Sequence, residues 1–193
     1  MLTVHGAILK SDHIEPRDGE PFTVLMFGRM EAYKGVCILH DAAAELSRDE
    51  RPAQFHLAGR GPELDRLGDE LRALPNVRVD DRFIPSAELI AFIQAADCIV
   101  LPYLEATQSG VLAAALANER FVIASRTGGI PDVVEDGVNG LLVPPGDSAA
   151  LVTAIRRAAS DGALRRRLAQ GARGSVRDHL DWNIIAKAVL ADY

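Results

Sequence analysis

The chain has 193 residues, of which 48% are hydrophobic, 25% charged and only 5% aromatic, and its net charge is -6 at pH 7. This length suits one well-buried domain with an aliphatic core, as in a sheet covered by helices. The negative net charge argues against a general nucleic-acid binder, so no nucleic-acid partner is expected.

The chain begins with a polar segment and then alternates between strands and helices. Residues 1–21 are irregular and polar toward their end, which predicts a linker or tail. Residues 22–27 form a continuous apolar run, typical of a strand buried on both faces of a parallel sheet. Further strands are expected over residues 53–58, 76–79, 98–101, 121–124 and 140–143, and helices over 34–46, 62–74, 86–96 with Ser86 as its cap, 109–116 and 130–135.

The last part of the chain reads as helical. Asp147 is a good N-cap for a helix over residues 148–160, and helices over 163–171 and 175–193 are expected to follow. The alternation predicts an α/β fold: a doubly wound, mostly parallel, Rossmann-like sheet with a helical C-terminal tail. Ligands of such sheets bind outside the carboxyl ends of the strands, so the loops after the strands are the candidate site.

One such loop carries glycines and two cations. Gly28 and Arg29 end the first strand, and Lys34 and Gly35 open the next helix. Glycine permits close approach of a ligand, and Arg29 and Lys34 offer a guanidinium fork and a point charge for phosphate oxygens. A structural interpretation, with Lys34 solvated and Arg29 paired with Glu31, fits the spacing equally well.

A second anion site is indicated within residues 105–117, where small residues stand between a strand and a helix. Free backbone N–H groups and the positive end of the helix dipole attract anions at such a place. Two anion sites in one sheet suggest a ligand with a diphosphate. Ser and Thr are also ordinary helix caps, so this stretch is weak by itself.

Several other kinds of site are disfavoured. Gly59-Arg60-Gly61-Pro62 is not a dinucleotide fingerprint, because the third glycine would fall at Leu64; a tight turn is the favoured interpretation. No nucleophile elbow surrounds Ser109. The five histidines lack metal-ligand spacing, so no metal is expected, and His56 within an apolar strand is interpreted as a core residue.

Cysteine usage and the absence of a recognisable leader predict a cytoplasmic protein. Cys37 and Cys98 lie in apolar runs and are expected to be buried free thiols. Seven arginines lie between Arg156 and Arg177, against the acids Asp161 and Asp178. A solvated helical face is the favoured interpretation, and peripheral contact with the inner membrane face or with a partner domain is the alternative.

Taken together, the motifs over residues 22–192 resemble the C-terminal, donor-binding domain of the retaining family-four (group 1) glycosyltransferases of the GT-B fold. The carrying motifs, in order, are Gly28-Arg29 with Lys34-Gly35, Ala58-Gly59-Arg60-Gly61-Pro62, Phe83-Ile84-Pro85, Ala96-Asp97 with Leu101-Pro102, Ser109-Gly110-Val111, Val122-Ile123-Ala124-Ser125, Gly128-Gly129-Ile130-Pro131-Asp132, and the run from Asp136 to Asp147.

This resemblance implies a donor nucleoside-diphosphate sugar, with uridine as the expected base, and neither a metal nor a cofactor. Arg29 and Lys34 would hold the diphosphate and stabilise the leaving group, which makes them the implied catalytic residues. The implied donor-binding residues are Gly28, Gly59, Phe83 and Ile84 beside the base, Glu105, Thr107, Gln108, Ser109, Gly110 and Val111.

The chain departs from the family in two ways. The family commonly has two glutamates at the positions that Ala106 and Ala114 occupy here, and the second glutamate usually binds the ribose. Glu105 lies one residue before the first of these positions. The N-terminal acceptor domain of similar size is missing, so residues 22–193 are expected to form a donor-binding domain alone.

The resemblance therefore implies half of a hexosyltransferase of polysaccharide or glycolipid synthesis. The isolated chain is expected to bind nucleotide weakly and to be inactive, and the missing domain is its expected partner. Self-association through the surface where that domain would dock is a further expectation. A non-catalytic nucleotide-binding module and half of a sugar-nucleotide epimerase are the alternatives.

Overall fold

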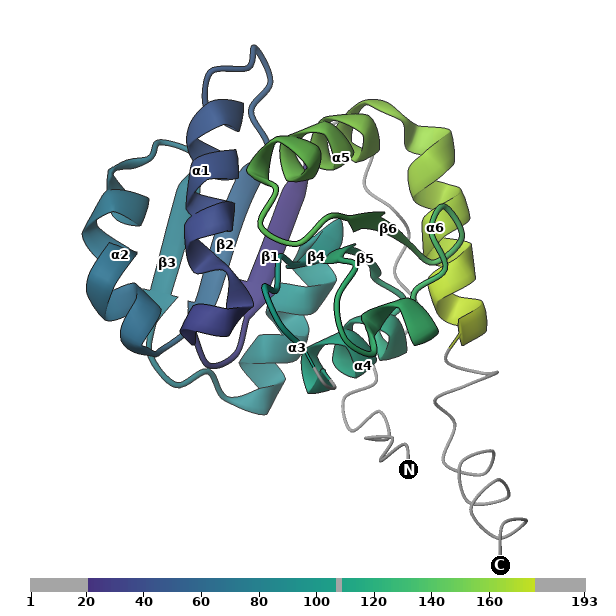
Figure 1. The fold of residues 1–193 in the computed structure, drawn as a ribbon, viewed down its shortest axis with the longest axis horizontal. Coiled ribbons are helices and arrows are strands. Elements are labelled where there is room, and N and C mark those ends of the chain that lie inside the picture. Colours follow the sequence, from purple (N-terminus) through teal and green to yellow (C-terminus); the bar gives the residue numbers. More distant parts are fainter. Residues whose placement is uncertain (1–20, 107–108, 176–193) are drawn as a thin grey trace, which may run out of the picture.

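A computed structural model describes residues 21–106 and 109–175. Six strands form one parallel sheet in the order β3-β2-β1-β4-β5-β6 (Figure 1). The strands are β1 (Thr23–Phe27), β2 (Gln54–Gly59), β3 (Val77–Asp81), β4 (Cys98–Leu101), β5 (Phe121–Ser125) and β6 (Gly140–Val143). All five strand pairs are parallel, which confirms the predicted sheet.

Helices cover both faces of this sheet. They are η1 (Ala32–Lys34), α1 (Val36–Leu46), α2 (Pro62–Ala73), α3 (Ser86–Ala95), α4 (Gly110–Ala117), η2 (Ile130–Asp132), α5 (Ser148–Ser160) and α6 (Gly162–Ser175). On one face α1 packs between α2 and α5, while α3 and α4 cover the other face (Figure 1). The predicted doubly wound α/β architecture is therefore confirmed.

The chain order reverses between β1 and β4, which are neighbours in the sheet although two strands separate them in sequence. Their register pairs Val24 with Cys98 and Leu25 with Ile99. Because the chain leaves these two strands toward opposite faces, a crevice opens at their carboxyl ends. The loops that follow β1 and β4 are those in which sequence analysis places its two anion sites.

The core is aliphatic, as the low aromatic content predicts. Leu25, Leu57, Ile99 and Ile123 lie at the centre of their strands and are completely buried. Each such side chain contributes about 1.5–3 kcal/mol of hydrophobic free energy relative to exposure. These contacts hold the strand ends, and hence the loops of the crevice, in fixed positions.

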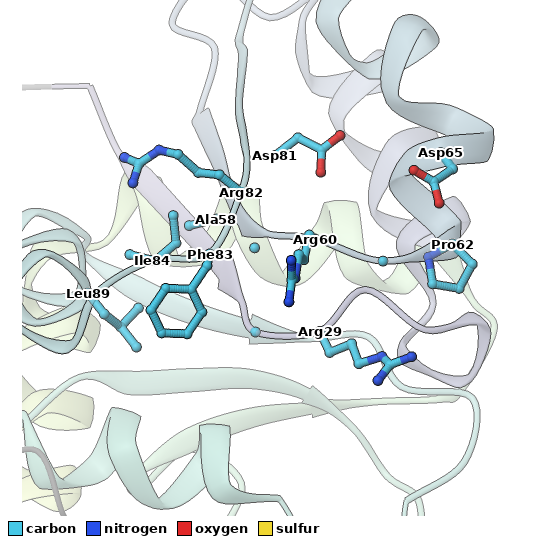
Figure 2. Close-up of a pocket in the computed structure, with 13 residues that line it drawn as sticks. Arg29, Ala58, Arg60, Pro62, Asp65, Asp81, Arg82, Phe83, Ile84 and Leu89 are labelled. Carbon is cyan, nitrogen blue, oxygen red and sulfur yellow. The ribbon is translucent and has the colours of Figure 1, made fainter.

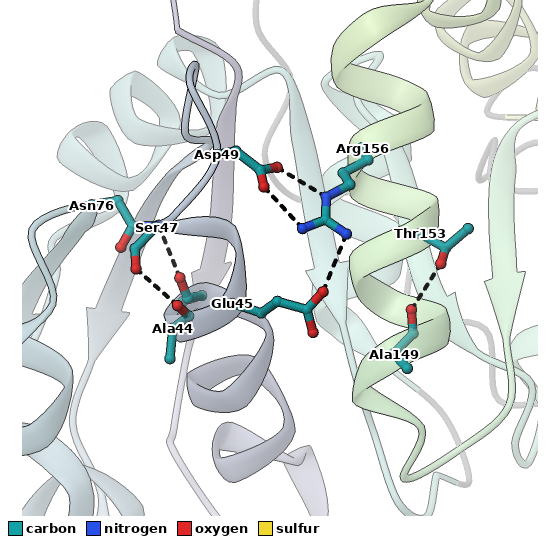
Figure 3. A network of polar contacts seen from close by, with 9 residues as sticks. Ala44, Glu45, Ser47, Asp49, Asn76, Ala149, Thr153 and Arg156 are labelled. Carbon is teal, nitrogen blue, oxygen red and sulfur yellow. Dashed lines mark hydrogen bonds and ion pairs between the residues drawn. The ribbon is translucent and has the colours of Figure 1, made fainter.

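Arg156 joins α5 to α1 at the surface (Figure 3). Its guanidinium donates two hydrogen bonds of 2.9 Å to the carboxylate of Asp49 and one of 3.1 Å to Glu45. Arg173 of the same basic region pairs with Glu119 at 2.9 Å, and Arg165 donates to the carbonyl of Ala159 at 2.7 Å. These arginines therefore have partners within the protein.

Some local predictions need correction. Ser86 is the first residue of α3 and not its cap; Pro85 takes the cap position, where its extended ψ of 148° keeps it outside the helix, and no side chain caps the first turn. The helix expected over 130–135 is only a 3₁₀ turn, and α6 runs without a break to Ser175.

Other local predictions hold or lie outside the described range. Asp147 caps α5 as expected, accepting a hydrogen bond of 2.8 Å from the backbone N–H of Ala150. Cys98 is buried, but Cys37 is only half-buried. The predicted linker, apart from its last residue Pro21, and the predicted helix beyond Ser175 lie outside the described residues.

Candidate functional site

The loops after β1 and β4 are in direct contact at the crevice. The backbone N–H of Leu104 donates to the carbonyl of Tyr33 at 2.7 Å. Gly35 has a left-handed φ of +68°, and a Cβ there would lie 2.0 Å from the carbonyl oxygen of Pro102. Only glycine fits this position, so Gly35 fixes Lys34 against the second loop.

Lys34 is nearly buried at this junction, with 7% of the residue exposed. Its Nζ lies 5.7 Å from the ring centroid of Tyr103. A Cβ added to Gly28 would lie 3.2 Å from this Nζ and 3.6 Å from the side chain of Val111. Among the described residues, no carboxylate lies within ion-pair distance of Nζ. Burial lowers the pKa of Lys34, and the nearby charge of Glu31 opposes this in part. Lys34 is thus not solvated, contrary to the structural interpretation.

Arg29 is in the opposite situation. Its side chain is 77% exposed and forms an ion pair with Glu31, as the structural interpretation expects. The pair lies at the surface, where such contacts contribute little and exchange readily. Arg29 can therefore turn toward an anion at small energetic cost.

The start of α4 faces the same junction. Ser109 is the N-cap, and its Oγ accepts a hydrogen bond of 3.2 Å from the backbone N–H of Leu112. The Tyr103 hydroxyl lies 3.5 Å from that Oγ, and burial raises the pKa of Tyr103 to about 12, which keeps the phenol neutral. The N–H groups of Gly110 and Val111 belong to the first turn, where a helix offers no internal acceptor, so they attract anions together with the dipole.

A cleft of about 850 Å³ opens beside this junction (Figure 2). Its lining residues include Gly28, Arg29, Gly59, Arg60, Phe83, Ile84 and Leu89. Phe83 is 72% exposed, which is unusual for a phenyl ring and leaves its face open to a planar ligand. Gly59 is required for close approach, because a Cβ there would lie 1.9 Å from the carbonyl oxygen of Gly28.

The sheet order arranges these groups in a row. Phe83 follows β3, Gly59 ends β2, Arg29 and Lys34 follow β1, and Ser109 follows β4. Adjacent strands are about 4.8 Å apart, so the row spans roughly 14 Å from the apolar wall to the helix N-terminus. An apolar platform at one end and cations with free N–H groups at the other suit a ligand with a base at one end and phosphates at the other.

The structure brings most of the predicted site residues together. Gly28, Arg29, Gly59, Phe83 and Ile84 line the cleft, Lys34 and Val111 lie against Gly28, and Ser109 and Gly110 begin α4. Glu105 is exposed and does not line the cleft. Thr107 and Gln108 lie outside the described residues.

Sequence reasoning did not single out Tyr103 or Arg60. Tyr103 shields the ammonium of Lys34, and its place directly after Pro102 at the end of the fourth strand was a usable signal. Arg60 stands between two glycines in a loop that the sequence pattern treats as a turn, although its side chain lines the cleft.

A further polar cluster joins β2 to β3. His56 Nε2 and Asp80 Oδ2 are 2.7 Å apart, and Arg78 pairs with the same carboxylate at 2.9 Å. The His56 ring packs edge-on against Phe92, with 4.4 Å between centroids. His56 is therefore a hydrogen-bonded core residue, as the sequence indicates, and it does not line the cleft.

Neither a metal site nor a membrane span is found within the described ranges. Residues 21–106 and 109–175 contain no group of three His, Cys, Asp or Glu side chains that could hold a metal ion. No helix in the same ranges is both long and apolar enough to cross a bilayer.

Comparison with known proteins assigns the chain and its fold to a family. Residues 21–161 match the family model for glycosyl transferases group 1, so the chain belongs to that family. It is 35% identical over 185 residues to a glycogen synthase of Mycobacterium tuberculosis, a match that covers 92% of this chain and 43% of the relative.

Two solved structures show the same fold. The C-terminal domain of the Francisella tularensis group 1 glycosyl transferase LpcC has a TM-score of 0.75 at 20% identity, covering 91% of this chain and 97% of that one. Anabaena HepE in complex with UDP-glucose has a TM-score of 0.74 at 25% identity, covering 89% of this chain and 48% of that one. The chain spans about half the length of HepE and of the glycogen synthase; its fold is that of a GT-B glycosyltransferase C-terminal domain.

Proposed function

We propose that this chain is the donor-binding half of a retaining glycosyltransferase that transfers a sugar from a nucleoside-diphosphate sugar, with uridine as the base. The observation that carries the proposal is the ammonium of Lys34, which is nearly buried, lacks a carboxylate partner among the described residues and lies close to the open side of Gly28. A buried ammonium without an opposite charge is energetically unfavourable, and a bound anion would supply that charge. The complex of HepE with UDP-glucose supports the choice of ligand.

The row of groups assigns a role to each end of the donor. Phe83 and Ile84 would border the base, and the outer end of the diphosphate would lie against Lys34, Arg29 and the first turn of α4. When the sugar leaves, negative charge develops on the departing diphosphate. The nearly buried Lys34, an Arg29 turned toward the ligand and the free N–H groups of α4 would stabilise that charge without a metal, which is how Lys34 and Arg29 would accelerate transfer.

The acceptor half of the site would come from a separate N-terminal domain. This follows from the half-length match to the relatives, in which the chain accounts for 43% and 48% of the two longer proteins. Residues 22–193 would then form one donor-binding domain that is inactive by itself. A sensitive transfer assay with UDP-glucose and simple acceptors is expected to show no product, and detectable transfer by the isolated chain would refute this part of the proposal.

Nucleotide binding tests the donor site directly. Calorimetric titration of the chain is expected to show weak binding of UDP and weaker binding of GDP and ADP. Arg29→Ala and Lys34→Ala should each reduce affinity for UDP about tenfold or more, the effect of losing one hydrogen bond to a charged group.

The control for this experiment is Arg48→Ala. Arg48 is an exposed arginine in the turn after α1, at the opposite end of that helix from the cleft. Its removal changes the net charge as Arg29→Ala does, so equal loss of affinity in both variants would contradict a specific site. Absence of binding to all three nucleotides would contradict a donor site in the isolated chain.

A further inference from the structure

Arg60 is fixed at the floor of the cleft by its backbone. Its carbonyl accepts a hydrogen bond of 2.9 Å from the N–H of Met30, and Gly28 bonds to the carbonyl of Ala58 at 3.0 Å. Gly59 and Gly61 flank it, and a Cβ on Gly61 would lie 2.6 Å from the carbonyl oxygen of Met30. Two close backbone contacts thus determine where the side chain of Arg60 starts.

The guanidinium of Arg60 is exposed in the cleft, and among the described residues it has no ion-pair or hydrogen-bond partner. The other two arginines that line the cleft are paired: Arg29 with Glu31, and Arg82 with Glu88. Asp81, one of two carboxylates at the cleft, is held by Arg72 at 3.3 Å; the other, Asp65, has no contact with Arg60. Arg60 therefore offers its full donor fork to a ligand.

The order of strands says which part of the ligand Arg60 would meet. It follows β2, between Phe83 after β3 and Arg29 after β1. Figure 2 shows the side chain of Arg60 between those of Phe83 and Arg29. A nucleotide with its base at Phe83 and its terminal phosphate at Lys34 would carry its ribose and the phosphate nearest the nucleoside across β2, the strand between those two ends.

We infer that Arg60 is a further donor-binding residue, which binds the phosphate nearest the nucleoside, while Lys34 and Arg29 hold the outer one. This inference rests on the proposed function. A guanidinium fork matches two phosphate oxygens, and its charge-assisted hydrogen bonds are stronger than neutral ones. Arg60 would thereby make the site selective for nucleotides over nucleosides.

The experiment compares UDP, UMP and uridine by ligand-observed NMR titration of the wild-type chain, Arg60→Gln and Arg29→Gln. Arg60→Gln should weaken UDP and UMP alike, by about fivefold to tenfold for an exposed charge-assisted contact, and should leave uridine unchanged. Arg29→Gln should weaken UDP more than UMP. Arg60→Lys keeps the charge but loses the guanidinium fork, so its affinity for UDP and UMP should lie between those of wild type and Arg60→Gln.

The outcomes separate the two proposals. If Arg29→Gln weakens UDP while Arg60→Gln leaves UDP and UMP unchanged, the role of Arg60 is overturned and the donor site stands. If uridine weakens as much as UMP in Arg60→Gln, Arg60 contacts the nucleoside and the phosphate assignment is wrong. If the wild-type chain binds none of the three, the proposed function fails as well. Circular dichroism melting of each variant verifies that the fold is kept.

Discussion

At the scale of a single residue, the buried charge of Lys34 favours anion binding but lowers the stability of the free protein. Burial lowers its pKa from the usual value of 10.5, which means that the charged form is less stable in the folded protein than in the unfolded chain. Below that pKa the protein carries this penalty in full, and the penalty is relieved as pH rises from the folded pKa toward 10.5. An anion beside Nζ would remove it, so the residue suits binding at the expense of the free protein's stability.

Lys34→Met is therefore expected to stabilise the free chain by about 1 kcal/mol, because an apolar side chain keeps the packing on Tyr103 without the buried charge. The same variant should lose UDP binding. Urea unfolding and nucleotide titration measure the two effects.

Arg29→Met is the matched variant: Arg29 is 77% exposed, so it should lose binding without gaining stability. A destabilised Lys34→Met protein would show that the buried ammonium contributes favourably to folding, contrary to this account.

At the scale of elements, glycines set how closely the loops approach. Gly35 needs a left-handed φ and lies where a Cβ would collide with the carbonyl of Pro102, whereas a Cβ on Gly110 at the start of α4 would meet nothing within 4 Å. The first glycine is a requirement of the crevice. The second leaves the helix N-terminus open, which is useful to a ligand and not to the fold.

The two glycines should respond differently to the same change. Gly35→Ala is expected to lower the free energy of unfolding by more than about 1 kcal/mol and to weaken UDP binding, since the strained backbone must move Lys34. Gly110→Ala should leave stability unchanged or slightly higher, because alanine is the better helix former. Thermal melting of both variants measures these effects. Equal losses of stability in Gly35→Ala and Gly110→Ala would contradict the steric argument.

At the scale of the whole molecule, overall stability depends on pH through the cluster of His56, Asp80 and Arg78. Burial lowers the pKa of His56 from 6.5, against the raising effect of its hydrogen bond with Asp80, and the charges of Arg78 and Arg82 lower it further. Burial raises the pKa of Asp80, but the hydrogen bond from His56 and the charge of Arg78 bring it below 3.8.

The unfolded chain therefore takes up a proton at His56 before the folded protein does. The contribution of His56 to stability is complete above pH 6.5 and declines as pH falls from 6.5 toward its lowered pKa; the contribution of Asp80 is lost only below pH 3.8. The urea concentration at the unfolding midpoint should be lower at pH 5.5 than at pH 7.5. The His56→Asn variant should show a smaller difference between the two pH values. An unchanged slope in His56→Asn would assign the decline to other groups.

Much of the fold could be predicted because it follows from local patterns. Apolar runs such as residues 22–27 and 98–101 became buried strands, and the capping role of Asp147 depends on one side chain and its next turn. Ser86 was misassigned because serine is a common cap, whereas the helix begins one residue earlier than expected, with Pro85 in an extended conformation at the cap position. Local chemistry decided both cases.

The candidate site was predictable in part. The glycines and cations after β1 could be recognised from the sequence, as could the small residues that begin α4, because loops after parallel strands gather at one edge. Spacing alone left the phosphate-binding and the structural interpretations of Lys34 and Arg29 equally good. The structure separates them, since burial depends on Tyr103, which is far from Lys34 in the sequence.

By itself the sequence determined the α/β class, the order of the elements and the edge at which a ligand would bind, since hydrophobic periodicity and turn residues act over a few positions. Only the tertiary structure decided the burial of Lys34, the pairing of Arg29 with Glu31 and the placement in the cleft of Arg60, which is unpaired among the described residues. Those properties depend on which strands become neighbours, and strand pairing joins residues that local patterns cannot relate.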